Sequence, residues 1–157
     1  IVFDIHGHGI NPDGYYDLRT WLGYLIKSDE LDLPDEELNT IAFKDKSSIR
    51  ALADLSPFAF VNIVRGETSL GTILDSLGYE CVPSVNGPGP AGSRYFSGGY
   101  ITARHGSRDG GIISAIQVEL PQPGIRDTGE NLSKFASIFT TAVSTYYSYH
   151  LEQNIQP

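Results

Sequence analysis

The pattern of hydrophobic residues predicts strands and helices that alternate along the chain. Residues 1–5 are mostly apolar and predict a buried strand that ends at Gly7. Residues 21–26 and 100–103 have the composition of further strands. Residues 112–120 form a nearly continuous apolar run, which is typical of a strand at the centre of a sheet.

Apolar residues at helical spacing predict the helices. Residues 68–77 carry one apolar face, with Thr68 as the expected N-cap. A longer stripe predicts a C-terminal helix over residues 132–152, and a shorter helix is expected after Ser47 or Ser48. This order of strands and helices predicts an α/β fold with a mixed, largely parallel sheet flanked by helices.

Two segments between these elements have little apolar periodicity. Residues 28–46 are rich in Asp and Glu and are interpreted as a solvated excursion. Residues 84–99 are rich in Gly, Pro and Ser and predict a loop. This loop contains a Gly-x-Gly-x-x-Gly spacing, but its prolines and the absence of a following helix pattern argue against a dinucleotide site.

Composition limits the classes of function. The 157 residues are 40% hydrophobic and 19% charged, as expected for one packed domain over residues 1–157. The net charge of −8 argues against nucleic acid or an anionic membrane as the main partner. No apolar run approaches the roughly 20 residues of a membrane span. The single cysteine excludes an intrachain disulfide and a Cys-rich zinc site.

The chain begins at Ile1 and contains no Met. We therefore expect that a segment was removed or that the chain is part of a larger fold, with the upstream part missing or on another polypeptide. The Asn131-Leu132-Ser133 triplet has the form of a glycosylation sequon. Both features favour a secreted or processed compartment over the cytoplasm.

The first candidate site is the segment Asp4-Ile5-His6-Gly7-His8. Side chains alternate along an extended strand, so Asp4, His6 and His8 are expected on one face. Two imidazoles with this spacing can bind a divalent metal, and the carboxylate can join them or orient one of them. The alternative is a pair of hydrogen-bonded loop histidines.

The second candidate site follows the glycine-rich loop. Gly98 and Gly99 would let the backbone approach a ligand closely. Arg104 and Arg108 carry fork-shaped donors that suit a carboxylate, and His105 is a candidate ligand or transition-state donor. Structural ion pairs with the acidic surface are the alternative for these arginines.

The third candidate is Glu119, which lies near the end of the most apolar predicted strand. Burying a carboxylate among apolar residues is costly unless it is paired or hydrogen-bonded, so this position indicates either such a partner or a functional role. It is the candidate general base, and the alternative is a salt bridge or a cap.

Several short segments carry a family resemblance in their order along the chain: Phe3-Asp4-Ile5-His6-Gly7-His8-Gly9, Arg65-Gly66-Glu67-Thr68-Ser69-Leu70-Gly71, Tyr95-Phe96-Ser97-Gly98-Gly99-Tyr100, Arg104-His105-Gly106-Ser107 and Gln117-Val118-Glu119. This set resembles the N-formylglutamate amidohydrolase family, which is related to zinc carboxypeptidases and aspartoacylases. The resemblance implies a zinc-exopeptidase type of α/β fold. It also implies zinc-dependent hydrolysis of an amide in an N-acyl amino acid or a similar small carboxylate substrate.

The resemblance implies roles for particular residues. His6 matches the family's last zinc ligand, in its Asp-x-His motif, and Glu119 matches the general base that activates water. Arg104 and the Gly98-Gly99 turn match the region that receives the substrate.

The family's other zinc ligands lie upstream of that motif, before the first residue of this chain. A companion chain therefore supplies them, or His8 and His105 complete an altered site, or the metal site is inactive. Arg104 or Arg108 would bind the substrate carboxylate. Arg65 is a candidate oxyanion donor or else part of an ion pair, and His105 is a second candidate donor.

The sequence leaves alternatives to a zinc-dependent amidohydrolase. The Asp-x-His-x-His spacing is also similar to the polymerase-and-histidinol-phosphatase family and to barrel amidohydrolases, which need more strands and more metal ligands. No Gly-x-Ser-x-Gly elbow of a serine hydrolase occurs. The alternative from another class is a non-catalytic binding or structural subunit with an incomplete metal site.

Overall fold

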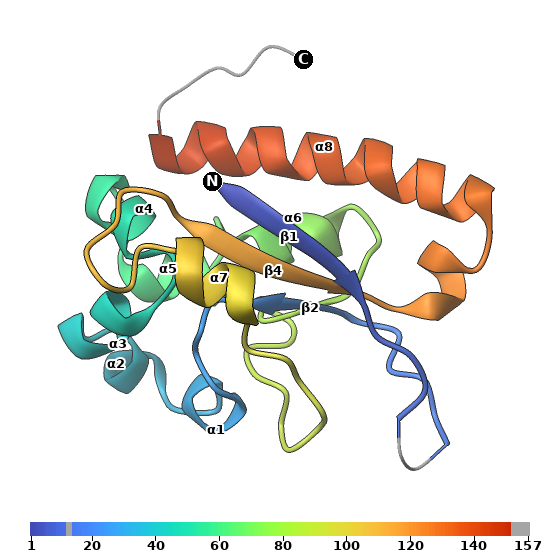
Figure 1. The fold of residues 1–157 in the computed structure, drawn as a ribbon, viewed down its shortest axis with the longest axis horizontal. Coiled ribbons are helices and arrows are strands. Elements are labelled where there is room, and N and C mark those ends of the chain that lie inside the picture. The colour runs from blue at the N-terminus through green and yellow to red at the C-terminus, as the bar shows by residue number, and fades with distance from the viewer. Residues whose placement is uncertain (12–13, 152–157) are drawn as a thin grey trace.

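The computed structural model describes residues 1–11 and 14–151, which form a mixed four-stranded sheet with helices on both faces (Figure 1). The strand order is β1-β4-β2-β3. β1 pairs with β4 and β2 pairs with β3 in parallel, whereas β2 and β4 are antiparallel. The general α/β prediction is confirmed. The strands are β1 (Val2–Gly7), β2 (Thr20–Gly23), β3 (Cys81–Val82) and β4 (Ala115–Leu120).

Helix α8 (Gly129–Leu151) covers one face of the sheet, and its buried Phe135 and Tyr146 join the core with Ile116 and Val118 of β4. Phe3 of β1 packs on this face too, with its ring edge against Phe139 at 5.4 Å between centroids. None of the helices in the described residues combines the length and apolar character of a membrane span.

The opposite face of the sheet is covered by the loop that precedes α7 (Tyr100–His105) and by α7 itself. Helix α6 (Leu70–Ser76) packs against α8 and is capped by Ser69, one residue later than predicted. The remaining helices are α1 (Ser28–Leu31), α2 (Asp35–Leu38), α3 (Ile41–Lys46), α4 (Arg50–Leu55) and α5 (Phe60–Arg65), and a π-turn spans Gln122–Arg126.

Three predictions from the pattern need correction. The segment 100–103 is helical rather than a strand, because none of the described strands pairs with it and the turn satisfies its own backbone, with Ala103 N–H donating to the Gly99 carbonyl. The central strand starts at Ala115, since Ile112 is 91% exposed. The acidic segment 28–46 contains short helices, because apolar side chains among the acids reach the core.

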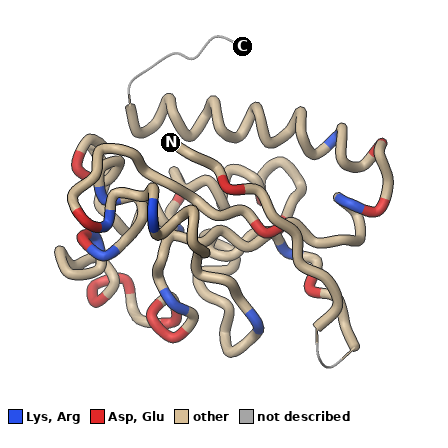
Figure 2. Tube along the Cα trace, in the orientation of Figure 1, with Lys and Arg blue, Asp and Glu red and all other residues tan. Residues whose placement is uncertain are grey.

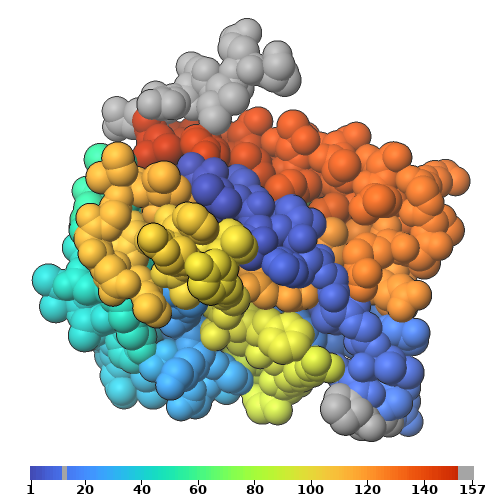
Figure 3. Space-filling model, in the orientation of Figure 1, coloured from blue at the N-terminus to red at the C-terminus, as the bar shows by residue number. Residues whose placement is uncertain are grey.

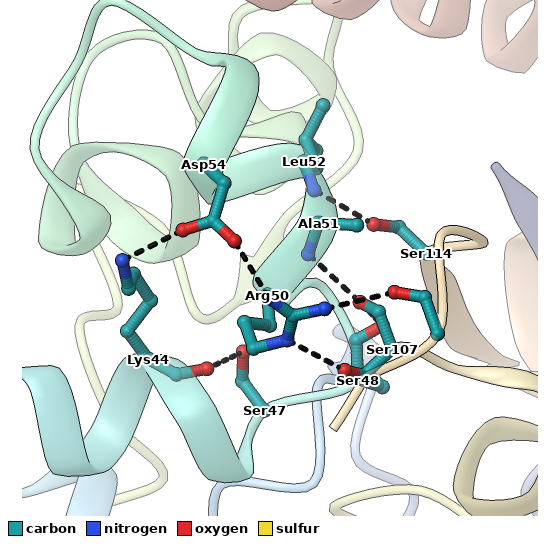
Figure 4. Close-up of polar contacts among 10 residues, drawn as sticks. Lys44, Ser47, Ser48, Arg50, Ala51, Leu52, Asp54, Ser107 and Ser114 are labelled. Atoms are coloured by element: carbon teal, nitrogen blue, oxygen red, sulfur yellow. Dashed lines mark hydrogen bonds and ion pairs between the residues drawn. The ribbon is translucent and has the colours of Figure 1, made fainter. Parts of the chain in front are cut away.

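Helix α4 is capped by side chains that are distant in the sequence (Figure 4). Its N-cap residue, Ile49, has no side chain that can accept a hydrogen bond. Ser107 Oγ instead accepts from Ala51 N–H at 2.9 Å, and Ser114 Oγ accepts from Leu52 N–H at 3.0 Å. Arg50 also donates to the carbonyl oxygens of the connection between α7 and β4. The first turn of α4 therefore fixes that connection in place.

Replacing Ser107 with alanine is expected to lower the free energy of unfolding by about 1 kcal/mol, because a buried N–H at the start of α4 loses its acceptor. Urea unfolding of the purified protein measures this change. Ser137→Ala is the matched control, since that hydroxyl lies on the exposed side of α8. Equal stability of the two variants would contradict the capping role.

Candidate functional site

The register of the sheet places the predicted polar residues side by side. Asp4 pairs with Gln117 and His6 pairs with Glu119 across the parallel strands β1 and β4. Residues in register on adjacent strands point to the same face, so these four side chains share one side of the sheet. We call the side of the sheet that carries Asp4, His6, Gln117 and Glu119 the polar face. The same row continues into β2, where Trp21 pairs with Glu119. The sequence could not show that β1 and β4 are neighbours.

Glu119 is buried, with 5% of its surface exposed. Its Oε1 accepts a hydrogen bond of 2.6 Å from Gln117 Nε2. Neither an ion pair nor another hydrogen bond to this carboxylate is found among the described residues. A buried carboxylate that lacks a cationic partner is costly for stability, and such groups are found disproportionately at functional sites.

His8 lies over the same face but is held away from Asp4 and His6. Its ring stacks on Trp21, with 3.7 Å between centroids and an angle of 8°. Its Nε2 lies 3.0 Å from the carbonyl oxygen of Arg19 and must donate, because a carbonyl only accepts. His8 Nδ1 is then a buried acceptor without a hydrogen-bond partner among the described residues.

Burial lowers the pKa of His8 below its usual value, while the hydrogen bond to Arg19 and the charges of Asp17 and Glu119 act in the opposite direction. Asp17 also accepts from Trp21 Nε1 at 3.2 Å. The stacked pair is therefore fixed from both sides as a neutral imidazole on an indole. This arrangement makes His8 part of the wall beside Glu119.

The glycine-rich loop closes over the other end of this polar face. A side chain at Gly23 of β2 would lie 2.7 Å from the backbone of Ser97 and Gly98, so only glycine permits this approach. A Cβ at Gly99 would lie 3.0 Å from Gln117 Oε1, the oxygen of that amide without a partner. The Gly98-Gly99 turn therefore does lie against the predicted polar face.

Asp4 and His6 form the one contact in this region that resembles a metal site. His6 Nε2 lies 2.9 Å from Asp4 Oδ1, and 48% of the His6 side chain is exposed. No group of three or more His, Cys, Asp or Glu that could hold a metal occurs among the described residues. A zinc site needs three or four such ligands, so the described part of this chain supplies at most part of a set.

Arg104 and Arg108 line a separate pocket of about 430 Å³ with Tyr100 and the 106–111 turn. Arg108 pairs with the neighbouring Asp109 at 3.1 Å, whereas Arg104 has no ion pair or hydrogen bond among the described residues. His6 and Glu119 do not line this pocket. His105 is exposed at the end of α7 and does not line this pocket.

Arg65 lies apart from all the other candidate site residues. Only 6% of it is exposed. Its guanidinium donates to the carbonyl oxygens of Leu31 and Leu33 and to Asp35 Oδ1 at 2.9 Å. These contacts agree with the ion-pair alternative that the sequence left open. The Arg65 guanidinium links α5 to the α1–α2 region.

The sequence did not mark two residues near this site, Trp21 on the polar face and Arg126 at the ends of β1 and β4. Trp21 is 1% exposed and was assigned only to a strand, although a strand that begins with the sole Trp could have drawn attention. Arg126 crosses the ends of β1 and β4, donating from Nε to the Leu120 carbonyl at 3.0 Å. Its guanidinium occupies the space where a side chain at Gly7 would lie. No sequence pattern marked it.

Comparison with family models, with curated proteins and with solved structures finds no match to this chain. The likeness to N-formylglutamate amidohydrolases therefore rests on the short segments of the sequence.

Proposed function

We propose that this protein hydrolyses the amide bond of a small substrate that carries a carboxylate, as an N-acyl amino acid does. The observation that carries the proposal is the register of β1 and β4, which sets His6 beside the buried Glu119. Hydrolysis of an amide needs a base for water and an acid for the leaving amine, and one carboxylate can serve both steps.

Glu119 is the general base in this proposal. Gln117 holds one of its oxygens, which orients the carboxylate. The other oxygen takes a proton from the attacking water and later returns it to the amine nitrogen as the carbon–nitrogen bond breaks. Trp21 and His8 form the wall on the β2 side of this carboxylate and limit its contact with bulk water.

Asp4 and His6 are the residues that would hold a zinc ion, because a carboxylate and an imidazole are ligands that zinc accepts. A bound zinc ion in such an enzyme polarises the carbonyl group and activates water. The described residues supply no third ligand, so we propose that a companion chain completes the set. This chain's own contribution is the pair of Asp4 and His6, whose Oδ1 and Nε2 atoms lie 2.9 Å apart.

Arg104 is proposed to bind the substrate carboxylate, with Arg108 beside it. The supporting observation is a guanidinium without an ion pair among the described residues, in a pocket of about 430 Å³. Guanidinium groups bind carboxylates through two parallel hydrogen bonds. The substrate must then extend from the α7 pocket to the polar face of the sheet.

The test is hydrolysis of a series of N-acyl amino acids by the full chain with added zinc. We expect amine release, and we expect Arg104→Ala to lower kcat/KM by about 10-fold or more through loss of the bidentate contact. Arg94→Ala is the matched control, since Arg94 lies over the Phe96 ring outside the pocket. No amine release from any member, with zinc present, would overturn the proposal.

A non-catalytic binding subunit is the second candidate function. It is favoured by the incomplete ligand set of the described residues. In that case the protein would bind N-acyl amino acids through Arg104 without cleaving them. Binding of an N-acyl amino acid measured by calorimetry, without release of amine, would support this second function over hydrolysis.

A further inference from the structure

One edge of the sheet is open. β1 is the terminal strand, and none of the other described strands pairs with its outer side. The N–H groups of Val2 and His8 point inward, donating to Ser114 and Leu120 at 2.8 and 3.0 Å. Because this direction alternates along a strand, the N–H and C=O groups of residues 3, 5 and 7 point outward. The edge can therefore pair with another strand.

The α8 side of this edge is apolar or uncharged. Ile5 is 50% exposed and Val2 is 37% exposed, although both belong to a strand. β1 lies at the surface between α7 and α8 (Figure 3). Beyond Lys134, α8 carries no charged residue as far as His150, and Figure 2 shows this length of helix without charge. A charge-poor helix beside an open strand edge is typical of the core of a subunit interface.

We propose that β1 pairs in antiparallel orientation with β1 of a second copy of this chain, with Ile5 opposite the second copy's Ile5. The residues with outward backbone groups then face each other as hydrogen-bonded pairs. In this register His6 of each copy faces Asp4 of the other, so an imidazole that can donate a hydrogen bond lies opposite a carboxylate that can accept one. The two half-exposed Ile5 side chains cover one another on the opposite face.

Neighbouring symmetric registers lack this complementarity. A shift that centres the pair on Asp4 would set two carboxylates directly opposite each other, which is destabilising. A shift that centres it on His6 would set the two imidazoles opposite each other and leave Asp4 facing His8, whose ring is already stacked on Trp21. The register centred on Ile5 is also the one that pairs the whole of residues 2–8.

The pairing also completes a set of metal ligands. Two Asp4 and two His6 side chains would lie on one face, with directly opposite Cβ atoms about 5 Å apart. Four ligands of this kind suit tetrahedral zinc, whereas each described chain alone offers two. The second copy is then the companion chain. This metal step rests on the proposed function, whereas the choice of strand edge and register rests on the open edge of β1.

The experiment measures the molar mass and the zinc content of the full chain, first treated with a chelator and then with zinc chloride. We expect the mass to rise from that of one chain to that of two on zinc addition, with one zinc per two chains. His6→Gln should abolish the zinc-dependent rise, because it removes both imidazoles. Ile5→Lys should abolish the pair by placing two ammonium groups opposite each other.

Ile41→Lys is the matched control, since Ile41 is an exposed apolar residue of α3 away from this edge. Thermal unfolding shows whether each variant is folded. If Ile5→Lys does not fold, Asp4→Asn replaces it as the second variant in this test. One zinc bound per single chain would overturn the proposal, as would a pair unaffected by both variants or a different polypeptide bound to this edge. A single chain that still hydrolyses amides would refute the pairing alone. A zinc-bound pair without hydrolysis would refute the proposed function alone.

Discussion

Glu119→Gln is expected to lower kcat for amide hydrolysis by at least about 100-fold, because the glutamine cannot take a proton from water. The substitution keeps the size of the side chain and can still accept the hydrogen bond from Gln117. The free energy of unfolding should therefore change by less than about 1 kcal/mol. Steady-state kinetics and urea unfolding of the same preparation measure both quantities.

The control for this variant is Glu80→Gln, which removes an exposed carboxylate at the start of β3 and should leave kcat unchanged. If Glu119→Gln retains full kcat in a folded protein, Glu119 is not the general base. If Glu119→Gln is inactive because it is unfolded, the loss of activity reflects stability and not the loss of a general base. The urea unfolding curve distinguishes these two outcomes.

Arg65→Met is expected to lower the free energy of unfolding by roughly 3 kcal/mol, because several hydrogen bonds from a buried charged group are lost together. The carbonyl oxygens of Leu31 and Leu33 lose their donor, and Asp35 loses its ion pair. Asp35 is mostly exposed, so its charge returns to water at little cost. Methionine retains much of the apolar stem, which limits the effect to the polar contacts.

Urea unfolding measures this loss, and Arg94→Met is the control, with an expected change within about 0.5 kcal/mol at an exposed position. The folded fraction of Arg65→Met should hydrolyse substrate with unchanged KM. A stable variant with a lowered kcat would instead give Arg65 the role of oxyanion donor, the alternative that the sequence left open.

The polar face shows which side-chain positions can be predicted from the alternation of residues along a strand. Alternation along an extended segment predicts that Asp4 and His6 share a face, and the 2.9 Å contact between them agrees. The same rule included His8, which lies over the same face but stacks on Trp21 and does not join Asp4 and His6. Periodicity describes the backbone of the strand, but the side chain at its end follows the neighbours that the fold provides.

Secondary structure was predictable where a long stripe of apolar residues repeats. The C-terminal helix has such a stripe, and α8 is found there. The segment 100–103 has strand-forming residues but is a single helical turn, because its place over the sheet leaves it no strand to pair with. The caps of α4 come from Ser107 and Ser114, which no local pattern could indicate.

The sequence by itself determined the α/β class, a buried central strand within residues 112–120 and the chemical types of residue that the candidate site offers. These depend on local periodicity and composition, which act over a few residues. Only the tertiary structure decided that His6 and Glu119 are in register, that Arg65 is fully engaged elsewhere and that none of the described strands pairs with the outer edge of β1. Those properties depend on which distant segments lie side by side, and that choice is made by packing of the whole core.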